Sequence, residues 1–247
     1  MVVITALKIA DVNTVFGFFP KRKIDCSLER LISLIEKYRI SKALTISLKS
    51  AFYDYVEGNE ETLRACNGDS RLIPVASVDP RAYLGGLDEI EEMRKRGFRA
   101  VRLFTEFQSY PFDYAPLLRL FKNLEGMDLP LLIYNTGYGL MTKVARETKG
   151  RDYPVIMLGC SYSALSEFIV LSIKNPHLYI ETSLLDTPDA FELLTRKVGS
   201  SRIIFGSGIP LNYFESSYLM VEKAEISEHD KELILYYNLE DLLKGFP

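Results

Sequence analysis

Residues 71–104 read RLIPVASVDPRAYLGGLDEIEEMRKRGFRAVRLF. The runs RLIPVASVDP and FRAVRLF are rich in apolar residues, which indicates strands, and the segment LGGLDEIEEMRKRG between them has the pattern of a helix. Gly97 stands at the end of that helix, where glycine is a common stop signal. The stretch therefore predicts one strand–helix unit followed by the strand of the next unit.

The same alternation of strand and helix runs along the whole chain. The expected strands are VVITALKIADV (2–12), SKALTISLK (41–49), RLIPVASVDP (71–80), FRAVRLF (98–104), LPLLIYN (129–135), YPVIMLGC (153–160), LYIETS (178–183) and RIIFG (202–206). Several are apolar throughout, as parallel strands covered on both faces should be. About eight units at a steady spacing predict an α/β fold, a single (β/α)8 TIM barrel with room for distortion, as one domain over residues 1–247.

A doubly wound open sheet is the alternative arrangement of such units. It would carry a glycine-rich phosphate loop, G-x-G-x-x-G, after its first strand. The chain has DVNTVFGFF (11–19) at that place, and this segment lacks the motif. The barrel is therefore the better prediction.

The composition of the chain disfavours some classes of partner and compartment. The 247 residues carry a net charge of -3, which disfavours a nucleic-acid partner, and three widely spaced cysteines suit a reducing compartment. No targeting segment and no apolar run long enough to span a membrane is evident, so we expect a cytoplasmic protein that does not bind membranes. Gln108 is the only glutamine while Lys, Arg and Glu abound, which suggests a heat-loving source.

Polar side chains mark the expected carboxyl ends of the strands, where a TIM barrel carries its chemistry. In chain order these residues are Asp11 and Asn13; Ser47 and Lys49; Asp79; Arg102, Thr105 and Glu106; Asn135; Cys160 and Ser161; Glu181 and Ser183; and Ser207. They form the set from which a site should be drawn.

Several segments together resemble the amidohydrolase-related barrels, a group of metal-dependent hydrolases and decarboxylases. They are IADVNTVFGFF near the start of the chain, followed by RLIPVASVDPR, GFRAVRLF, LPLLIYNTG, IMLGCS, LYIETS and RIIFGSGIP in that order. The resemblance covers nearly the whole chain. It implies a barrel that binds a small molecule at its mouth and belongs to a hydrolase or lyase class.

The metal ligands that this resemblance implies are replaced. The family opens with Asp-x-His-x-His-x-Gly and binds a divalent metal through those histidines, further histidines after middle strands and an Asp after the last. At these positions the chain has Asn13, Val15, Asn135, Cys160 and Gly208. Because zinc needs three or four strong donors, we expect no metal and no other cofactor. His177 and His229 fall outside the expected strand ends and do not supply an alternative site.

Arg102 and Glu181 are the charged candidates if the strand faces that carry them line the interior of the barrel. Alternation places Arg102 on the same face as Phe98 and Ala100, and Glu181 on the same face as Ser183. Two interpretations stay open: an internal Arg102–Glu181 ion pair, or a clamp in which Arg102 binds a carboxylate or phosphate. Candidate acid–base residues are Asp11, Glu106 and Glu181. Candidate ligand-binding residues are Asn13, Arg102, Asn135, Cys160, Ser183 and Ser207.

Cys160 has a second interpretation as a nucleophile. A thiol at a strand end near a helix N-terminus can have a lowered pKa, but no histidine is placed to act as its base. We therefore expect Cys160 to be a small packing residue at a former ligand position.

Aromatic residues recur in the expected strand-to-helix loops. They are Phe16, Phe18, Phe19, Phe52, Tyr53, Tyr55, Phe107, Tyr110, Phe112, Tyr138, Tyr162 and Tyr213. They could line an apolar pocket or form the surface of a homodimer. We expect a small anionic or aromatic ligand, acted on by a metal-independent hydrolase or lyase. The alternative is a pseudoenzyme with a binding, regulatory or structural role.

Overall fold

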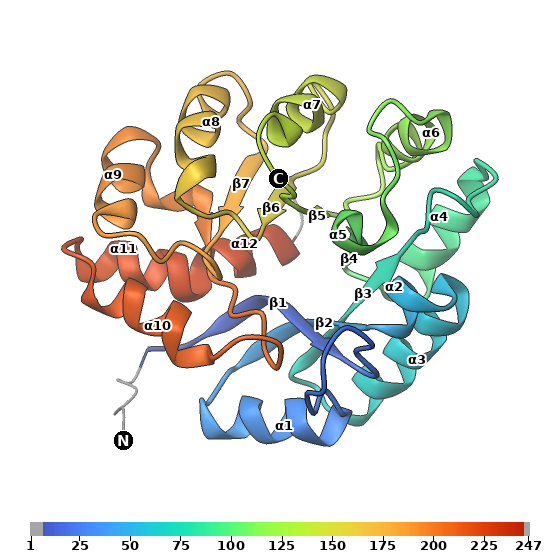
Figure 1. Cartoon of the computed structure of the whole chain (residues 1–247), viewed down its shortest axis with the longest axis horizontal. Helices are drawn as coiled ribbons and strands as arrows, with labels where there is room; N and C mark the ends of the chain where they lie inside the picture. The colour runs from blue at the N-terminus through green and yellow to red at the C-terminus, as the bar shows by residue number, and fades with distance from the viewer. Residues whose placement is uncertain (1–6, 245–247) are drawn as a thin grey trace.

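Eight parallel strands form one sheet in the order β1 to β8. The computed structural model describes residues 7–244. Each strand pairs with its neighbour in sequence, so the sheet curls in the manner of a (β/α)8 barrel, as predicted (Figure 1). The strands are β1 (Ala10–Phe16), β2 (Lys42–Ser47), β3 (Leu72–Ser77), β4 (Ala100–Leu103), β5 (Leu131–Tyr134), β6 (Val155–Leu158), β7 (Leu178–Glu181) and β8 (Ile203–Ile204).

The seam between β8 and β1 is bridged by backbone hydrogen bonds rather than by a regular ladder. Val12 N donates to Phe205 O over 3.0 Å, and Gly208 N donates to Asn13 O over 2.9 Å. The register of β1 against β2 also shifts between Asp11 and Thr14, as a β-bulge does. The barrel is therefore nearly closed, and its least regular part lies where the first strand meets the last.

Helices surround the barrel (Figure 1). The long segments between strands are α1 (Leu28–Lys37), α3 (Tyr55–Gly68), α4 (Leu87–Lys95), α6 (Ala115–Asn123), α7 (Leu140–Glu147), α8 (Tyr162–Ser172), α9 (Ala190–Lys197) and α10 (Phe214–Lys223). Short helices α2 (Lys49–Phe52) and α5 (Thr105–Gln108) follow β2 and β4. Within residues 7–244, no helix combines the length and apolar character that crossing a bilayer would need.

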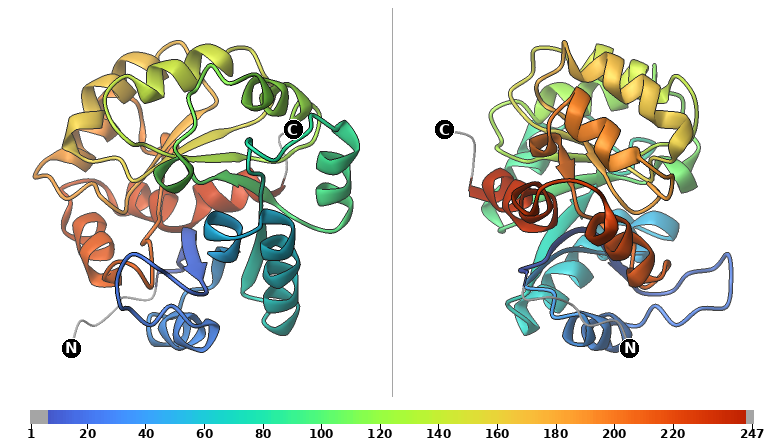
Figure 2. Two further views of the ribbon diagram at one scale, coloured as in Figure 1. Left: turned by 45° about the vertical axis from the view of Figure 1, so that its right-hand side comes forward. Right: turned by 90° about the vertical axis from the view of Figure 1, so that its left-hand side faces the viewer.

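The C-terminal segment closes the N-terminal end of the barrel. It comprises α11 (Glu228–Glu232), a π-helical turn (Leu233–Tyr237) and α12 (Asn238–Lys244). Leu239, Leu242 and Leu243 of α12 pack in the same cluster as the inward-facing strand residues. The loop between β1 and α1 projects on the opposite side of the barrel (Figure 2), so one end is plugged and the other can form a mouth.

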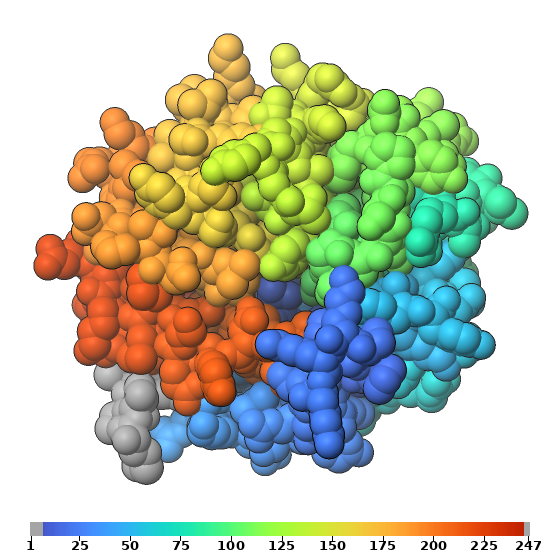
Figure 3. Space-filling view, in the orientation of Figure 1, coloured from blue at the N-terminus to red at the C-terminus, as the bar shows by residue number. Residues whose placement is uncertain are grey.

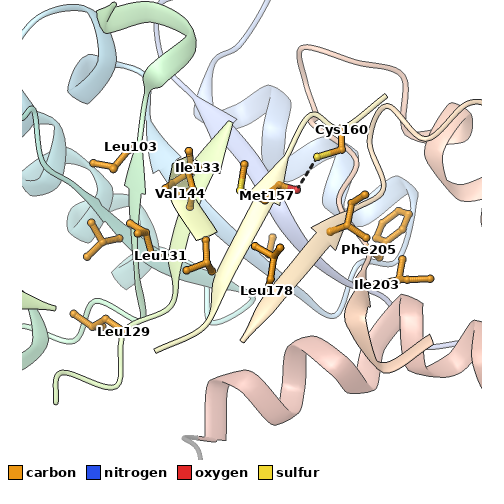
Figure 4. Packing of buried hydrophobic residues seen from close by; sticks show 14 of the residues in the cluster. Leu103, Leu129, Leu131, Ile133, Val144, Met157, Cys160, Leu178, Ile203 and Phe205 are labelled. Atoms are coloured by element: carbon orange, nitrogen blue, oxygen red, sulfur yellow. Dashed lines mark hydrogen bonds between the residues drawn. The ribbon is translucent and has the colours of Figure 1, made fainter. Parts of the chain in front are cut away.

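A larger apolar cluster fills the space between the barrel and its helices. Leu131, Ile133 and Met157 point into it from β5 and β6, and the side chain of Cys160 belongs to the same cluster (Figure 4). Cys160 is fully buried, and its Sγ donates to the carbonyl oxygen of Met157 over 3.6 Å.

The first strand lies later in the sequence than predicted. Residues 2–12 were expected to form it, but β1 spans Ala10–Phe16, and residues 2–6 of that expectation lie outside the described residues. The strand continues through Val15 and Phe16 because this β-branched and aromatic run suits extended backbone. It ends at Gly17, whose φ of 107° breaks the strand. DVNTVFGFF, expected to follow the strand, therefore contains most of it.

Candidate functional site

A cavity of about 360 Å³ opens at the C-terminal ends of the strands. Its wall combines apolar, aromatic and charged side chains, as ligand pockets commonly do. The residues that line it are Asn13, Val15, Phe19, Lys21, Arg22, Leu48, Arg102, Glu106, Phe107, Tyr134, Ser183, Gly208, Leu211 and Asn212. In the space-filling view the β1–α1 loop stands out near the centre of this face, beside a hollow (Figure 3).

Arg102 is the central cation of this cavity. Alternation along β4 points its side chain inward, in line with Ala100 and Phe104, which belong to the inner cluster. Its Nη1 donates to Asn13 Oδ1 over 2.9 Å, and its Nη2 donates to Glu106 Oε1 over 2.9 Å. The guanidinium also lies 4.6 Å from the centroid of the Phe104 ring, a cation–π distance. Asn13 on β1, Glu106 on α5 and Phe104 between β4 and α5 therefore hold the guanidinium in place.

Glu106 follows Arg102 by four residues and lies near the start of α5. The side chains of Arg102 and Glu106 are 6% and 10% exposed. Burial raises the pKa of Glu106 above its ordinary value, against the lowering effect of Arg102. Glu106 Oε2 and Arg102 Nε are buried without a hydrogen-bond partner among residues 7–244. This ion pair therefore keeps unused hydrogen-bonding capacity.

The β1–α1 loop covers one side of the cavity. Phe19 packs edge-on against Phe52 and Phe107, with ring centroids 5.7 Å and 6.0 Å away. Lys21 Nζ lies 4.6 Å from the centroid of the Phe107 ring. Arg22 Nη2 of the same loop donates to the carbonyl oxygen of Leu211. The loop is thus attached to both the β4 and the β8 sides of the mouth.

Asp11 lies outside the cavity lining, in the seam between β1 and β8. It is fully buried, and its Oδ1 accepts hydrogen bonds from Asn13 N over 2.9 Å and Ser207 N over 3.1 Å. Its Oδ2 accepts a hydrogen bond from the hydroxyl of Ser207. Burial raises the pKa of Asp11 to about 6, although these hydrogen bonds lower it. Asp11 and Ser207 therefore join two strands rather than face a ligand.

Glu181 has a similar position at the end of β7. Its Oε2 accepts from Gly159 N and from Ser183 Oγ, each over 2.9 Å, and its Oε1 accepts from Ser183 N over 2.7 Å. Burial, with a smaller contribution from the charge of Asp11, raises the pKa of Glu181 to about 7, although its hydrogen bonds from Gly159 and Ser183 lower it. A Cβ on Gly206 would lie 2.2 Å from Glu181 Oε1, which explains the glycine. Of the two open interpretations of Arg102, the ion pair with Glu181 is wrong, because Glu106 is the carboxylate that Arg102 contacts.

The remaining candidates divide between the cavity and the core. Asn13 and Ser183 line the cavity, whereas Asn135 and Cys160 lie outside its lining. Asn135 Oδ1 is buried and has no partner in the part of the chain that the structure describes. Cys160 is fully buried in the apolar cluster, and burial raises the pKa of its thiol well above the ordinary value; both favour the packing interpretation over the nucleophile interpretation.

Sequence comparison identifies the family. Residues 54–244 match the sequence model of the amidohydrolase family, which is more than half of the chain. The chain belongs to the amidohydrolase family. A search among curated proteins finds no match to it.

Solved structures of amidohydrolase-like proteins share the fold. A 5-carboxyvanillate decarboxylase from Sphingomonas paucimobilis is 12% identical with a TM-score of 0.75, covering 98% of this chain and 100% of that chain. A 2,6-dihydroxybenzoate decarboxylase from Rhizobium is 13% identical with a TM-score of 0.71, covering 96% and 99%. A putative 2-pyrone-4,6-dicarboxylic acid hydrolase from Pseudomonas putida is 16% identical with a TM-score of 0.75, covering 96% and 98%. At these identities the likeness concerns the fold alone.

The residues at the amidohydrolase family's metal positions do not fit a divalent cation. Asn13 Oδ1 already accepts a hydrogen bond from the positive Arg102, Val15 has a hydrocarbon side chain, and Cys160 is a buried thiol within the apolar cluster. Among residues 7–244, no group of three or more His, Cys, Asp or Glu side chains is arranged to hold a metal ion. The positive charge beside Asn13 is therefore the guanidinium of Arg102, at the place where the family has a metal ligand.

The backbone at Gly208, the last of these positions, disfavours a metal-binding aspartate. Its φ is +71°, and a Cβ there would lie 2.5 Å from Asn212 Nδ2. Asn212 can move, but the left-handed backbone still disfavours most side chains. We expect Gly208→Asp to lower the free energy of unfolding by about 1–2 kcal/mol and to bind no stoichiometric zinc.

Urea denaturation and elemental analysis of purified Gly208→Asp would measure both effects. Gly68→Asp is the matched control, because a Cβ on exposed Gly68 meets no atom within 4 Å and its φ is not positive. Tight zinc binding by Gly208→Asp would contradict the conclusion that the remaining side chains supply too few ligands for a metal ion.

Some site residues were missed from the sequence. Lys21, Arg22 and Asn212 lie in loops, where no period of alternation indicates which side chains turn inward. Tyr134 was overlooked although it precedes Asn135 at the end of an apolar strand. Strand alternation could have found it, because Leu132 and Tyr134 belong together in the inner cluster.

Proposed function

We propose that the barrel mouth binds a small carboxylate attached to a flat ring and that Arg102 holds its negative charge. The observation that carries this proposal is the position of Arg102 in the wall of a cavity of about 360 Å³, with N–H groups left over after its bonds to Asn13 and Glu106. Phe19, Phe107 and Tyr134 supply aromatic walls of suitable character for a ring.

The charge balance of the mouth supports an anionic ligand. Lys21, Arg22 and Arg102 line the cavity with Glu106 as their single acidic neighbour in the described lining. The cavity therefore keeps excess positive charge although the whole chain carries -3. Carboxylates match guanidinium geometry through paired hydrogen bonds. The decarboxylases and the hydrolase named above have ring carboxylic acids in their names, which agrees with this ligand class.

We infer that any chemistry at this mouth is metal-independent hydrolysis or carbon–carbon lyase chemistry with Glu106 as the acid–base group. Glu106 borders the cavity and has a free oxygen, whereas Asp11 and Glu181 have their oxygens occupied by strand-end groups. That same engagement of two of the three acidic candidates favours the second possibility, a pseudoenzyme that binds the ligand without turning it over.

Binding and turnover can be measured separately. We expect benzoate, 2,6-dihydroxybenzoate and 2-pyrone-4,6-dicarboxylate to be bound in calorimetry by protein that contains less than one zinc, manganese or iron per chain. Loss of carbon dioxide or ring opening, followed by NMR, would identify the enzyme, and binding without either product would favour the pseudoenzyme. One tightly held metal per chain would refute the metal-free proposal.

Lys21 and Lys23 provide a matched pair of variants in the same loop. Lys21 lines the cavity, whereas Lys23 is exposed outside its lining. Lys21→Met should weaken carboxylate binding roughly two- to fivefold, the range expected for an exposed charge. Lys23→Met should leave binding unchanged. Equal effects of the two variants would mean that the anion is bound elsewhere on the loop.

A further inference from the structure

The cation that should receive the ligand already has an anionic partner. Arg102 Nη2 lies 2.9 Å from Glu106 Oε1, and both side chains are almost fully buried. Burying these two charges costs free energy of desolvation. Their mutual attraction offsets that cost as long as one positive charge faces one negative charge. A ligand carboxylate bound to Arg102 would add a second negative charge to one guanidinium in this enclosed space.

We propose that the mouth takes up its carboxylate ligand together with one proton, which binds to Glu106. The inference rests on the proposed function and adds to it a coupling between ligand and proton. Two carboxylates that share one buried guanidinium raise each other's pKa, and the exposed Lys21 and Arg22 at the rim offset this less because water screens their charges. Glu106 Oε2, which is buried without a partner in residues 7–244, is the atom available for the proton. Once protonated, it can donate to the bound carboxylate.

The groups around Glu106 determine whether another residue could take the proton instead. Arg102 on β4 and Lys21 in the β1–α1 loop are cations that lower the pKa of Glu106. Tyr110 after α5 and Tyr134 on β5 are phenols whose pKa values burial raises, so they keep their protons near neutral pH.

Two carboxylates elsewhere in the barrel are the competing proton acceptors. Asp11 and Glu181 also have raised pKa values, but their oxygens bond to Ser207, Asn13, Gly159 and Ser183 and lie outside the cavity lining. They do not share a guanidinium with the ligand. A Glu106 variant therefore separates the two possibilities.

Calorimetry measures the proton directly. Benzoate is titrated into the full chain in triethanolamine and in Tris buffers, neither of which is an anion that competes for Arg102, from about pH 6 to about pH 9, where an ordinary carboxylic acid is ionised. The difference in binding enthalpy between the buffers gives the number of protons taken up. We expect close to one proton per benzoate, and an affinity that falls about tenfold per pH unit above the pKa of Glu106 in the free protein. Benzamide, which is uncharged, should bind without a proton.

Glu106→Gln should abolish both proton uptake and the pH dependence, because its amide oxygen can still accept from Arg102 but cannot be protonated in this range. Its affinity for benzoate near pH 9 should exceed that of the unchanged protein by at least about tenfold. Lys23→Met is the control, since it removes an exposed charge outside the cavity lining and should keep uptake of one proton.

The outcomes separate this inference from the proposed function. Failure of benzoate and of the ring carboxylates named above to bind would overturn both. Binding of benzoate without proton uptake, or uptake that persists in Glu106→Gln, would overturn only the coupling to Glu106.

Discussion

Replacement of Arg102 with Met should lower the free energy of unfolding by about 3–5 kcal/mol near neutral pH and remove carboxylate binding. The side chain of Met has similar length but leaves Glu106 as a buried charge without its cation, and Asn13 Oδ1 without a donor. The pKa of Glu106 is already raised by burial and would rise further. Urea denaturation measures the first effect, and calorimetry with benzoate the second.

The pH dependence and a double variant test the cause of this loss. As pH falls, Glu106 becomes protonated, so the cost of Arg102→Met should shrink towards acidic pH. Arg102→Met with Glu106→Gln should recover most of the stability near neutral pH, because no unpaired charge remains. It should not recover benzoate binding. If the single and double variants were equally unstable, packing rather than charge would explain the loss.

The number and order of the strands could be predicted because burial on both faces makes parallel strands into apolar runs. RLIPVASVDP and FRAVRLF contain β3 and β4, and RIIFG contains β8. The position of β1 could not be fixed in this way. Apolar residues extend from Val2 through Phe16, and period alone does not say which part of such a run joins the sheet.

Short helices were missed for a different reason. The helices α2 and α5 have four residues each, too few to show an apolar period, and both follow a strand directly. They matter for the site because α5 carries Glu106 four residues after Arg102. One of the two open interpretations paired Arg102 on β4 with Glu181 on β7, both at strand ends. The true partner is local, at the i+4 position.

Alternation grouped Arg102 correctly with Ala100, because side-chain direction along a strand follows from the backbone alone. It also grouped Phe98 with them, but Phe98 precedes β4 and lies in the outer apolar cluster. It could not predict that Asp11 and Glu181 bind backbone N–H groups. Those N–H groups belong to Ser207 and Gly159, which the chain places beside these carboxylates only when the barrel is formed. The acidic candidates were therefore identified from the sequence, but only Glu106 borders the cavity.

The free energy of unfolding should fall by about 6 kcal/mol as pH rises from about 4 to about 8. Asp11 has a pKa of about 6 in the fold against an ordinary value of 3.8, and Glu181 a pKa of about 7 against 4.5, and each shift is worth about 3 kcal/mol. Both folded-state values are raised, so the folded state binds these protons more tightly than the unfolded state. Their stabilisation is fully present below about pH 4 and is lost as pH rises through 6 and 7.

Other carboxylates act in the opposite sense at lower pH. Burial is outweighed for Asp69 and Asp230, whose hydrogen bonds to Arg71, and to Ser200 and Ser227, lower their pKa values. Stability from these groups is lost only as pH falls below about 4. The curve should therefore have its maximum at mildly acidic pH. Urea denaturation in steps of about one pH unit measures it, and a flat curve between about pH 4 and 8 would contradict the assignment.

Asp11→Asn and Glu181→Gln should give opposite results, although each removes one carboxylate. An asparagine oxygen at position 11 can accept from Asn13 N and Ser207 N, while its amide donates to Ser207 Oγ in place of Oδ2. The contact with Ser207 is then kept with its direction reversed, which leaves the Ser207 hydroxyl hydrogen without this acceptor. Asp11→Asn should therefore remove about half of the pH dependence and stabilise the fold by less than about 3 kcal/mol near pH 8.

Both oxygens of Glu181 accept from backbone N–H groups, Oε1 from Ser183 and Oε2 from Gly159. A glutamine amide would turn its own N–H towards one of these donors and leave that donor unsatisfied. Glu181→Gln should therefore lower the free energy of unfolding by about 1–3 kcal/mol at acidic pH, where the charge of Glu181 is absent. A Glu181→Gln variant as stable as Asp11→Asn at every pH would mean that burial of charge alone, without the direction of the hydrogen bonds, governs both sites.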